Sequence, residues 1–352
     1  MHATIVHMKE GKNLYDRHMN KRALEKKERA KMKYHNKPDR NVDISKFVPR
    51  NDLETLELGM IVEIRGKIFT VMLGEDFYEC RIKSSKDKDL ERYLVIGERV
   101  YGTFSGGKGV IEGMEPRKSY LSRFRGDYQR ISLANYDEHV IAANIDVGII
   151  VAAAKDPEFH PRLIDRYLIM CENGNVEPII CLNKADLTDE RDPVLDWYKK
   201  SGLRVIETSI QTGEGISELK DAIYGKIAVL VGHSGVGKSS LVNMILPGVN
   251  IVTKEVGDKR KTGRHTTTTS KLFEWEGGSY IIDTPGIRSL GLQHIDRDRL
   301  KYAFTEFSEY TEDCKYNDCS HSHEPVCGVK KAVQEGKIPH HRYDSYIRML
   351  NE

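Results

Sequence analysis

The chain has 352 residues, so we expect two or three domains. Its six cysteines are dispersed in the first half and clustered near the end, which excludes a disulfide framework. Charge interrupts the first 30 residues, which excludes a signal peptide, and the longest apolar run, VGIIVAAA at 147–154, is too short to span a bilayer. These features predict a reducing, cytoplasmic location and no membrane partner.

Residues 1–45 form a Lys-rich N-terminal extension. The formal net charge of the whole chain is +2, but residues 1–40 hold 12 Lys and Arg against 5 Asp and Glu. We expect this arm to be loose when it is free. Two interpretations stay open, an ordinary solvated tail or an electrostatic contact with a polyanion, most often nucleic acid.

Residues 46–120 have a different pattern. The stretches GMIVEIRGKIFTVMLGEDFYECRIK and GERVYGTFSGGKGVIEGM alternate apolar and polar residues between glycines. Five short strands with glycine turns predict a small β-barrel with the OB-fold. Some OB-folds bind oligonucleotides, whereas others bind protein or sugar, so the fold alone does not choose a ligand.

Residues 121–292 alternate strand and helix candidates. The strand candidates are DVGIIVAAA, PIICLN, RVIETS, IAVLVG and SYIIDTPG, and the helical stretches are 161–173, 190–201, 215–224 and 238–246. This alternation predicts a mostly parallel sheet with helices on both faces, in a multidomain α/β protein. Residues 293–352 are charged, predicted to be helical, and contain a Cys/His cluster.

Residues 232–240, GHSGVGKSS, match the phosphate-binding pattern G-x-x-x-x-G-K-[ST] between a strand and a helix. Glycines allow backbone N–H groups to face phosphate oxygens, and the helix N-terminus adds positive potential. We expect Lys238 to neutralise the β- and γ-phosphates and the Ser239 hydroxyl to bind Mg²⁺. The predicted nucleotide-binding residues of this loop are Gly232, Ser234, Gly235, Val236, Gly237, Lys238, Ser239 and Ser240. The alternative is a glycine-rich turn that matches by chance.

Asn183-Lys184-Ala185-Asp186 follows a strand candidate, at the edge where α/β sheets bind ligands. An ionised Asp186 accepts hydrogen bonds only, so it suits the two adjacent donors of guanine and disfavours adenine. Ser209, after the next strand candidate, is predicted to line the base pocket. The tetrapeptide alone is a weak signal, and a surface turn is the alternative.

Asp283-Thr-Pro-Gly286 follows a further strand candidate. We expect Asp283 to support Mg²⁺ and the Gly286 amide to sense the γ-phosphate. TGRHTTTTS at 262–270 suits a switch loop in which Thr267 is assigned to Mg²⁺. The motifs occur in the order base reader, base-pocket loop, phosphate loop, switch loop and D-x-x-G. Because a site depends on positions in space, this order predicts a circularly permuted GTPase.

Cys314, Cys319, His321 and Cys327 offer three thiolates and one imidazole within fourteen residues. Such a set is typical of a closed structural Zn²⁺ site. His323 is a rival ligand, and spacing alone does not choose between the two histidines. Reduced cysteines in a small core are the alternative.

Together these motifs resemble the ribosome small-subunit-dependent GTPase family, which are bacterial circularly permuted GTPases. The matching stretches are AANIDVGIIV, RLIDRYL, NKADL, GHSGVGKSSLVN, GRHTTT, DTPGIRSLGL and CKYNDCSH. The resemblance implies an OB-fold, a permuted GTPase domain and a zinc domain, with His321 as the zinc ligand. It also implies docking on the small (30S) ribosomal subunit and its 16S rRNA late in assembly, and release after hydrolysis of GTP to GDP. We expect a monomer.

Two features leave the chemistry open. Ile287 follows D-x-x-G, where Ras-like enzymes carry a water-orienting Gln, so we expect slow intrinsic turnover. His265 is the predicted catalytic residue, and its alternative is a surface histidine. A nucleotide-gated rRNA-binding module with incidental hydrolysis is the second functional class, and Asp186 disfavours a third, a P-loop ATPase or kinase. Basic residues predicted to contact rRNA phosphates are Arg117, Lys118, Arg123 and Arg125.

Overall fold

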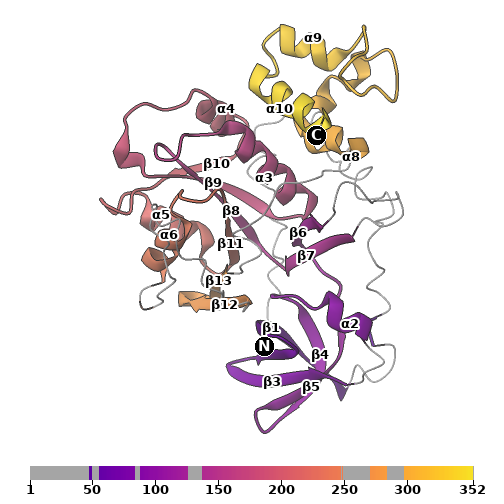
Figure 1. Cartoon of the computed structure of the whole chain (residues 1–352), viewed down its shortest axis with the longest axis vertical. Helices are drawn as coiled ribbons and strands as arrows, with labels where there is room; N and C mark the ends of the chain where they lie inside the picture. Colours follow the sequence, from indigo (N-terminus) through magenta and orange to yellow (C-terminus); the bar gives the residue numbers. More distant parts are fainter. Residues whose placement is uncertain are drawn as a thin grey trace, which may run out of the picture.

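The computed structural model describes residues 47–49, 55–83, 88–125, 137–246, 248, 270–283 and 297–351. Along the chain these residues form a β-barrel, a central α/β sheet and a helical C-terminal region (Figure 1). The predicted arm at 1–45 lies outside the described residues. Within the described part of the chain, no helix combines the length and the apolar character needed to cross a bilayer.

The N-terminal barrel contains five strands. They are β1 (Glu57–Arg65), β2 (Ile68–Leu73), β3 (Asp76–Ile82), β4 (Arg99–Ser105) and β5 (Lys108–Met114), with α2 (Lys88–Tyr93) between β3 and β4. Their order is β1-β2-β3-β5-β4, and β4 returns to pair with β1. Only β3 and β5 are parallel. This closed five-stranded arrangement confirms the predicted OB-type barrel.

The central sheet is parallel except at one edge. Its elements are β8 (Val147–Ala153), α3 (Pro161–Asn173), β9 (Glu177–Asn183), η5 (Ala185–Leu187), α4 (Val194–Lys200), β10 (Arg204–Glu207), α5 (Ile216–Ile223), β11 (Ile227–Val231), α6 (Lys238–Ile245), β12 (Ser270–Trp275), η6 (Glu276–Gly278) and β13 (Ser279–Asp283). The strand order is β10-β9-β8-β11-β13-β12, and β12 alone runs antiparallel to its neighbour β13.

The sheet buries both of its faces because side chains alternate along each strand. In β8, Val147, Ile149 and Val151 pack in the cluster that includes α5 and α6, whereas Ile150 and Ala152 pack in the cluster that includes α3 and α4. All seven residues of β8 are buried. The continuous apolar run in the sequence therefore reflects a central strand covered on both sides.

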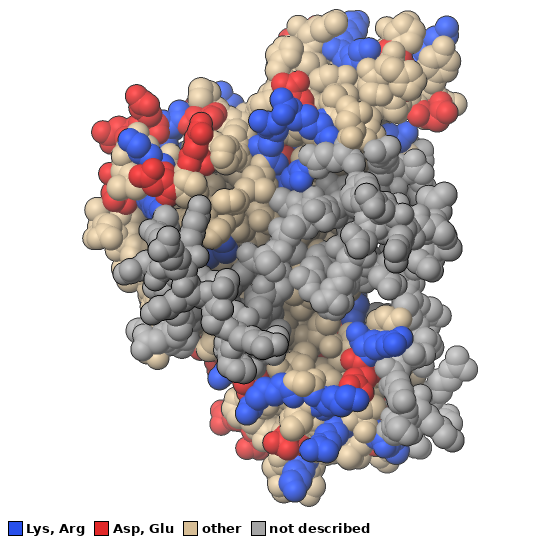
Figure 2. Space-filling model, in the orientation of Figure 1, with Lys and Arg blue, Asp and Glu red and all other residues tan. Residues whose placement is uncertain are grey.

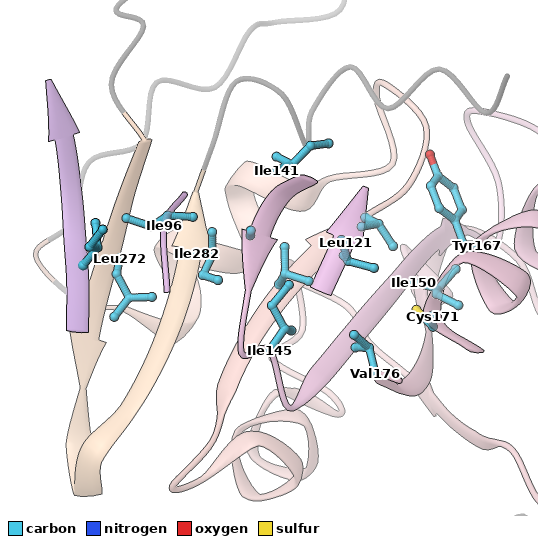
Figure 3. Packing of buried hydrophobic residues seen from close by; sticks show 14 of the residues in the cluster. Ile96, Leu121, Ile141, Ile145, Ile150, Tyr167, Cys171, Val176, Leu272 and Ile282 are labelled. Atoms are coloured by element: carbon cyan, nitrogen blue, oxygen red, sulfur yellow. The ribbon is translucent and has the colours of Figure 1, made fainter. Parts of the chain in front are cut away.

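The barrel and the sheet share one hydrophobic core. The ribbon of β6 (Tyr120–Arg125) and β7 (Asp137–Ala143) lies between them, and β1 also pairs with β12. Figure 3 follows the cluster from Ile96 through Leu121 to Ile150. Close packing over this length holds the barrel against the sheet.

The C-terminal region packs against the central domain through α3. Its elements are α8 (Arg297–Ala303), η7 (Thr305–Glu309), η8 (Thr311–Asp313), α9 (Gly328–Gln334) and α10 (His340–Asn351). Ile169 of α3 belongs to the same buried cluster as Phe304, Phe307 and Tyr346. One face of α3 therefore belongs to the core of the C-terminal region.

Candidate functional site

The predicted nucleotide loops lie along one edge of the sheet. Ala153 at the end of β8 pairs with Asn183 at the end of β9, and β11 ends at Val231, immediately before the glycine loop. Parallel strands bring their carboxyl ends to the same edge, where α/β proteins bind ligands. The segment that follows β9 and the glycine loop that follows β11, about fifty residues apart in the sequence, are therefore neighbours in space.

Asn183 joins these loops directly. Its side chain is fully buried, and its Nδ2 donates to the Val236 carbonyl of the glycine loop at 2.8 Å. Its Oδ1 accepts a hydrogen bond from the Thr208 hydroxyl at 3.1 Å. The Ala185 N–H donates to the Thr208 carbonyl at 3.1 Å. The tetrapeptide is therefore built into the sheet edge, and it is not an isolated surface turn.

The turn after Asn183 exposes one carboxylate. Lys184 has a left-handed backbone with φ of 58° and begins the short helix η5, and its Nζ donates to the Asp156 carbonyl. Asp186 in this helix is exposed. An exposed carboxylate on a fixed turn is available to accept two donors from a ligand.

Ser209 supports the neighbouring loop from within. It is fully buried, and its Oγ accepts a hydrogen bond from the Thr212 N–H at 3.1 Å. Its backbone N–H donates to the Glu214 carbonyl at 3.1 Å. The predicted contact of Ser209 with a base stays a prediction.

The glycine loop needs glycine at two positions. A Cβ at Gly232 would lie 2.2 Å from the Val151 carbonyl oxygen, and one at Gly237 would lie 2.3 Å from Asn183 Nδ2. Both residues also have positive φ, 146° and 96°, which side chains rarely allow. The loop therefore approaches the sheet edge more closely than other residues permit.

Lys238 closes the glycine loop in this structure. Its Nζ donates to the carbonyls of Gly232 and His233, each at 2.7 Å. Ser234 is exposed, Val236 is buried, and Gly235, Ser239 and Ser240 are partly exposed around the start of α6. An ammonium at this position can exchange loop carbonyls for phosphate oxygens, so the loop is chemically suited to bind phosphate.

Two residues at this edge were missed in the sequence. The Thr208 hydroxyl donates a hydrogen bond to Asn183. Thr208 directly precedes Ser209 in a hydroxyl-rich segment, and this position could have indicated its role from the sequence. Tyr167 of α3 has its hydroxyl near the backbone of Gly232. Burial raises the pKa of Tyr167 to about 12, and a hydrogen bond with that backbone partly offsets the increase. Tyr167 lies within the stretch RLIDRYL, but that pattern does not indicate a contact with Gly232.

Asp283 is the last residue of β13, which pairs with β11. Its side chain lies outside the described residues, as do His265, Thr267, Gly286 and Ile287. Their predicted roles stay predictions.

The Cys/His cluster converges in space. The donor atoms of Cys314, Cys319, His321 and Cys327 all lie within 4.8 Å of one another. His321 Nδ1 is 3.4 Å from Cys327 Sγ and 3.6 Å from Cys314 Sγ, and those two sulfurs are 3.9 Å apart. Ligands of a tetrahedral zinc ion are about 3.5–3.8 Å from one another. The donor set and its spacing fit zinc.

His323 is directed elsewhere. Its Nδ1 contacts the hydroxyls of Ser322 at 3.1 Å and Ser320 at 3.5 Å, and it is exposed. Burial lowers the pKa of His321 to about 4, which leaves its imidazole in the neutral form that binds metals. The geometry therefore favours His321 over His323.

The loop around this cluster is also braced. Burial opposes ionisation of Glu324, but the N–H groups of Ser320 and Ser322 donate to its carboxylate at 2.5 and 3.0 Å, and its pKa falls to about 2. The Gly328 N–H lies 3.3 Å from Cys314 Sγ, an interaction that supports a thiolate.

The expectation that Arg117 contacts RNA is corrected by its surroundings. Its Nε donates to the Glu98 carboxylate at 2.6 Å and its Nη2 to the Tyr93 carbonyl at 2.7 Å. The Arg117 side chain is only 10% exposed. Lys118 is exposed, whereas the side chains of Arg123 and Arg125 lie outside the described residues.

Comparisons with known proteins agree with this geometry. The family model described as RsgA GTPase matches residues 114–293. A relative from Sodalis glossinidius, named small ribosomal subunit biogenesis GTPase RsgA, is 38% identical and covers 78% of this chain and 79% of its own. A relative of the same name from Chlorobaculum parvum is 36% identical over 85% of this chain and 98% of its own.

Two solved structures have a similar fold. The crystal structure of YjeQ from Thermotoga maritima has a TM-score of 0.68 and 34% identity, covering 84% of this chain and 98% of that chain. The structure of YloQ, described as a circularly permuted GTPase, has a TM-score of 0.63 and 26% identity, covering 84% and 94%.

Proposed function

Because this chain belongs to the RsgA GTPase family, we propose that it hydrolyses GTP to GDP on the small ribosomal subunit and acts in late maturation of that subunit. The chain is a GTP hydrolase with a circularly permuted GTPase domain. One observation carries the assignment of the site: Asn183 bonds at once to the glycine loop and to Thr208, so base-reading and phosphate-binding segments form one unit.

The roles of the nucleotide-site residues follow from this unit. Asp186 reads guanine through its N1–H and 2-amino donors, while the glycine loop and Lys238 hold the β- and γ-phosphates. Asn183, Lys184 and Ser209 shape the base pocket. Mg²⁺, which accompanies GTP, neutralises charge on the phosphates when it is bound. The residues proposed to hold it are Ser239, Thr267 and Asp283, with Gly286 at the γ-phosphate.

The chemical step is slow without the subunit in this proposal. Ile287 lacks a polar group to orient water, so His265 or a group ordered by the ribosome supplies that function. Ile287 also supports the alternative, a nucleotide-gated rRNA-binding module in which turnover is incidental. Multiple-turnover assays with and without small subunits separate the two: strong stimulation supports the enzyme, and unchanged slow turnover supports the module.

The remaining chain provides structure and docking. We divide it into an arm at 1–45, a barrel at 46–120, a GTPase domain at 121–292 and a zinc domain at 293–352. One structural Zn²⁺ per chain, held by Cys314, Cys319, His321 and Cys327, fixes a loop with little apolar content of its own. The proposed partner is the subunit with its 16S rRNA, bound by a cytoplasmic monomer.

Base specificity tests the nucleotide site directly. Asp186→Asn removes a carboxylate that guanine requires, and GDP affinity should fall by about a hundredfold or more. Xanthine has a donor beside a carbonyl acceptor, which match the amide of Asn, so affinity for XDP should rise. Asp189→Asn, an exposed change three residues away, is the matched control and should alter neither affinity. Equal GDP affinity in both variants would contradict the assignment.

A further inference from the structure

A cationic groove lies between the GTPase domain and the C-terminal helices. It has a volume of about 520 Å³ and is lined by His160, Arg162, Leu163, Arg166, Ser345, Arg348, Met349 and Asn351. The first four residues lie at or just before the start of α3, and the last four lie on α10. Figure 2 shows Lys and Arg side chains gathered over this junction.

The groove concentrates positive charge on its two walls. Three arginines line it, and none of its described lining residues is a carboxylate. Arg162 and Arg166 are one turn apart on α3, and like charges at this spacing destabilise a helix. Burial and then the charge of Arg162 lower the pKa of Arg166. The exposed guanidiniums of Arg162 and Arg348 would attract an anionic ligand placed between the walls.

The residues that set the groove walls are fixed. Ser345 Oγ donates to Asp165 Oδ2 at 2.5 Å, and Arg342 Nη1 donates to Asp165 Oδ1 at 2.6 Å. Asp165 and Arg342 are buried, so α10 is held against α3 directly beneath the groove. Arg162 and Arg348 are exposed above it, one on each wall.

We propose that this groove binds the phosphate backbone of ribosomal RNA, with Arg162 and Arg348 contacting it from opposite walls. Arginine matches phosphate through two parallel hydrogen bonds, and charges spread over two helices suit a run of phosphates better than a single small anion. The inference rests on the proposed function, because the small subunit supplies the RNA. It adds a surface on which the GTPase domain and the zinc domain hold RNA together.

Binding of the intact protein to isolated small subunits, loaded with a non-hydrolysable GTP analogue, tests the groove. The double variant Arg162→Gln/Arg348→Gln should bind at least about tenfold more weakly at low salt. The slope of log affinity against log salt concentration should be smaller in magnitude than that of the unmodified protein, by between about one and two. Arg162→Lys/Arg348→Lys keeps the charges and should retain the slope.

Lys200→Gln/Lys331→Gln is the matched control. It also removes one exposed positive charge from each domain, outside the groove, and should change affinity by less than about twofold. Zinc content and GDP affinity should be unaltered in all variants, because the substituted side chains lie outside both candidate sites. Crosslinking of the bound protein should join the groove to RNA.

The inference would be overturned by equal loss in groove and control variants, by no loss in the groove variant, or by crosslinks from the groove to ribosomal protein alone. A groove variant that loses only binding of free pyrophosphate would also overturn it, in favour of a small-anion site. If the unmodified protein fails to bind subunits, the proposed function fails as well. If it binds and the groove variant binds equally, only the groove is wrong.

Discussion

At the scale of single residues, Asn183 determines how the nucleotide edge is assembled. Its amide offers a donor and an acceptor, and both are used inside the protein, by the Val236 carbonyl and the Thr208 hydroxyl. A buried polar group that loses its partner costs about 1–3 kcal/mol, so each of the three groups depends on the other two. This side chain therefore positions the glycine loop for a ligand.

Asn183→Ala should weaken nucleotide binding and stability together. It leaves the Val236 carbonyl and the Thr208 hydroxyl without their partner, and we expect a loss of about 1–3 kcal/mol in stability. Asn183→Asp should be worse, because a carboxylate would face the Val236 carbonyl with no proton between them. Fluorescent GDP titration and thermal unfolding measure both effects. Unchanged GDP affinity in Asn183→Ala would contradict the positioning role.

The sequence indicated Asn183 but not its partners. Its motif specifies a residue type at a strand end, and local patterns of this kind also predicted the glycine loop and the metal cluster. Thr208 and Tyr167 both lie in stretches with a recognisable pattern, but their roles were missed because they depend on which loop lies opposite, which a local pattern does not specify. Arg117 was assigned to RNA for its charge alone, whereas the fold places the Glu98 carboxylate beside it.

At the scale of elements, the candidate zinc loop (residues 314–327) is defined by geometry that spacing could not supply. His321 and His323 are two residues apart, so either could reach the cysteines. The chain gives His321 a left-handed backbone, with φ of 58°, and this directs its Nδ1 toward the sulfurs. The strands and helices were predictable from periodicity, but the choice between neighbouring histidines required the turn.

Replacing each histidine tests the zinc loop. His321→Ala removes a ligand and should lose most of the bound zinc, and the segment from 314 to 327 should become susceptible to protease. His323→Ala should retain one zinc per chain, because His323 contacts serine hydroxyls instead. Native mass spectrometry measures the stoichiometry. Loss of zinc in His323→Ala alone would show that the ligand is misassigned.

The barrel contains a buried ion pair whose charge state depends on pH. Glu98 is fully buried, and its Oε2 has no hydrogen-bond partner among the described residues. Burial, opposed by the Arg117 guanidinium, raises the pKa of Glu98 from 4.5 to about 7. Between pH 4.5 and about pH 7, Glu98 in the folded barrel retains a proton that it has released in the unfolded chain. The stabilising effect is complete below about pH 4.5 and is lost as the pH rises through about 7.

Glu98→Gln should remove this pH dependence. The amide does not titrate, so the stability of the unmodified protein should fall relative to that of Glu98→Gln between pH 5 and pH 8, by a few kcal/mol at most. Unfolding of both proteins across that range measures the difference. Carbon NMR of the Glu98 carboxyl gives an independent midpoint, expected near pH 7. A midpoint near 4.5 would contradict the prediction.

At the scale of the whole molecule, α3 connects the nucleotide edge to the zinc domain. Tyr167 lies near the backbone of Gly232, while Asp165 binds Arg342 of α10. Burial opposes the charge on Arg342, but the carboxylates of Asp165 and Glu306 keep its pKa well above the ordinary value. These partners are far apart in sequence, which explains why charge patterns gave no indication of the pair. Because both contacts lie on α3, we expect a change at Gly232 to reach α10 through this helix.

The buried pair should behave as a coupled unit when either partner is changed. Arg342→Met leaves the buried Asp165 carboxylate without its cation, which costs about 3–5 kcal/mol. Asp165→Asn should cost less, because Glu306 still pairs with Arg342 at 2.7 Å. The double variant leaves neither of these charges unpaired, so its loss should be smaller than the sum of the two single losses. Hydrogen exchange of α10, with β8 as the internal reference, measures the effect domain by domain, because a chain of several domains does not unfold in one step.

If α3 transmits nucleotide state, the single variants should also lose subunit-stimulated turnover while slow basal turnover persists. Additive losses in α10, or full stimulation in both single variants, would show that the pair is only one contact among many and that coupling follows another route.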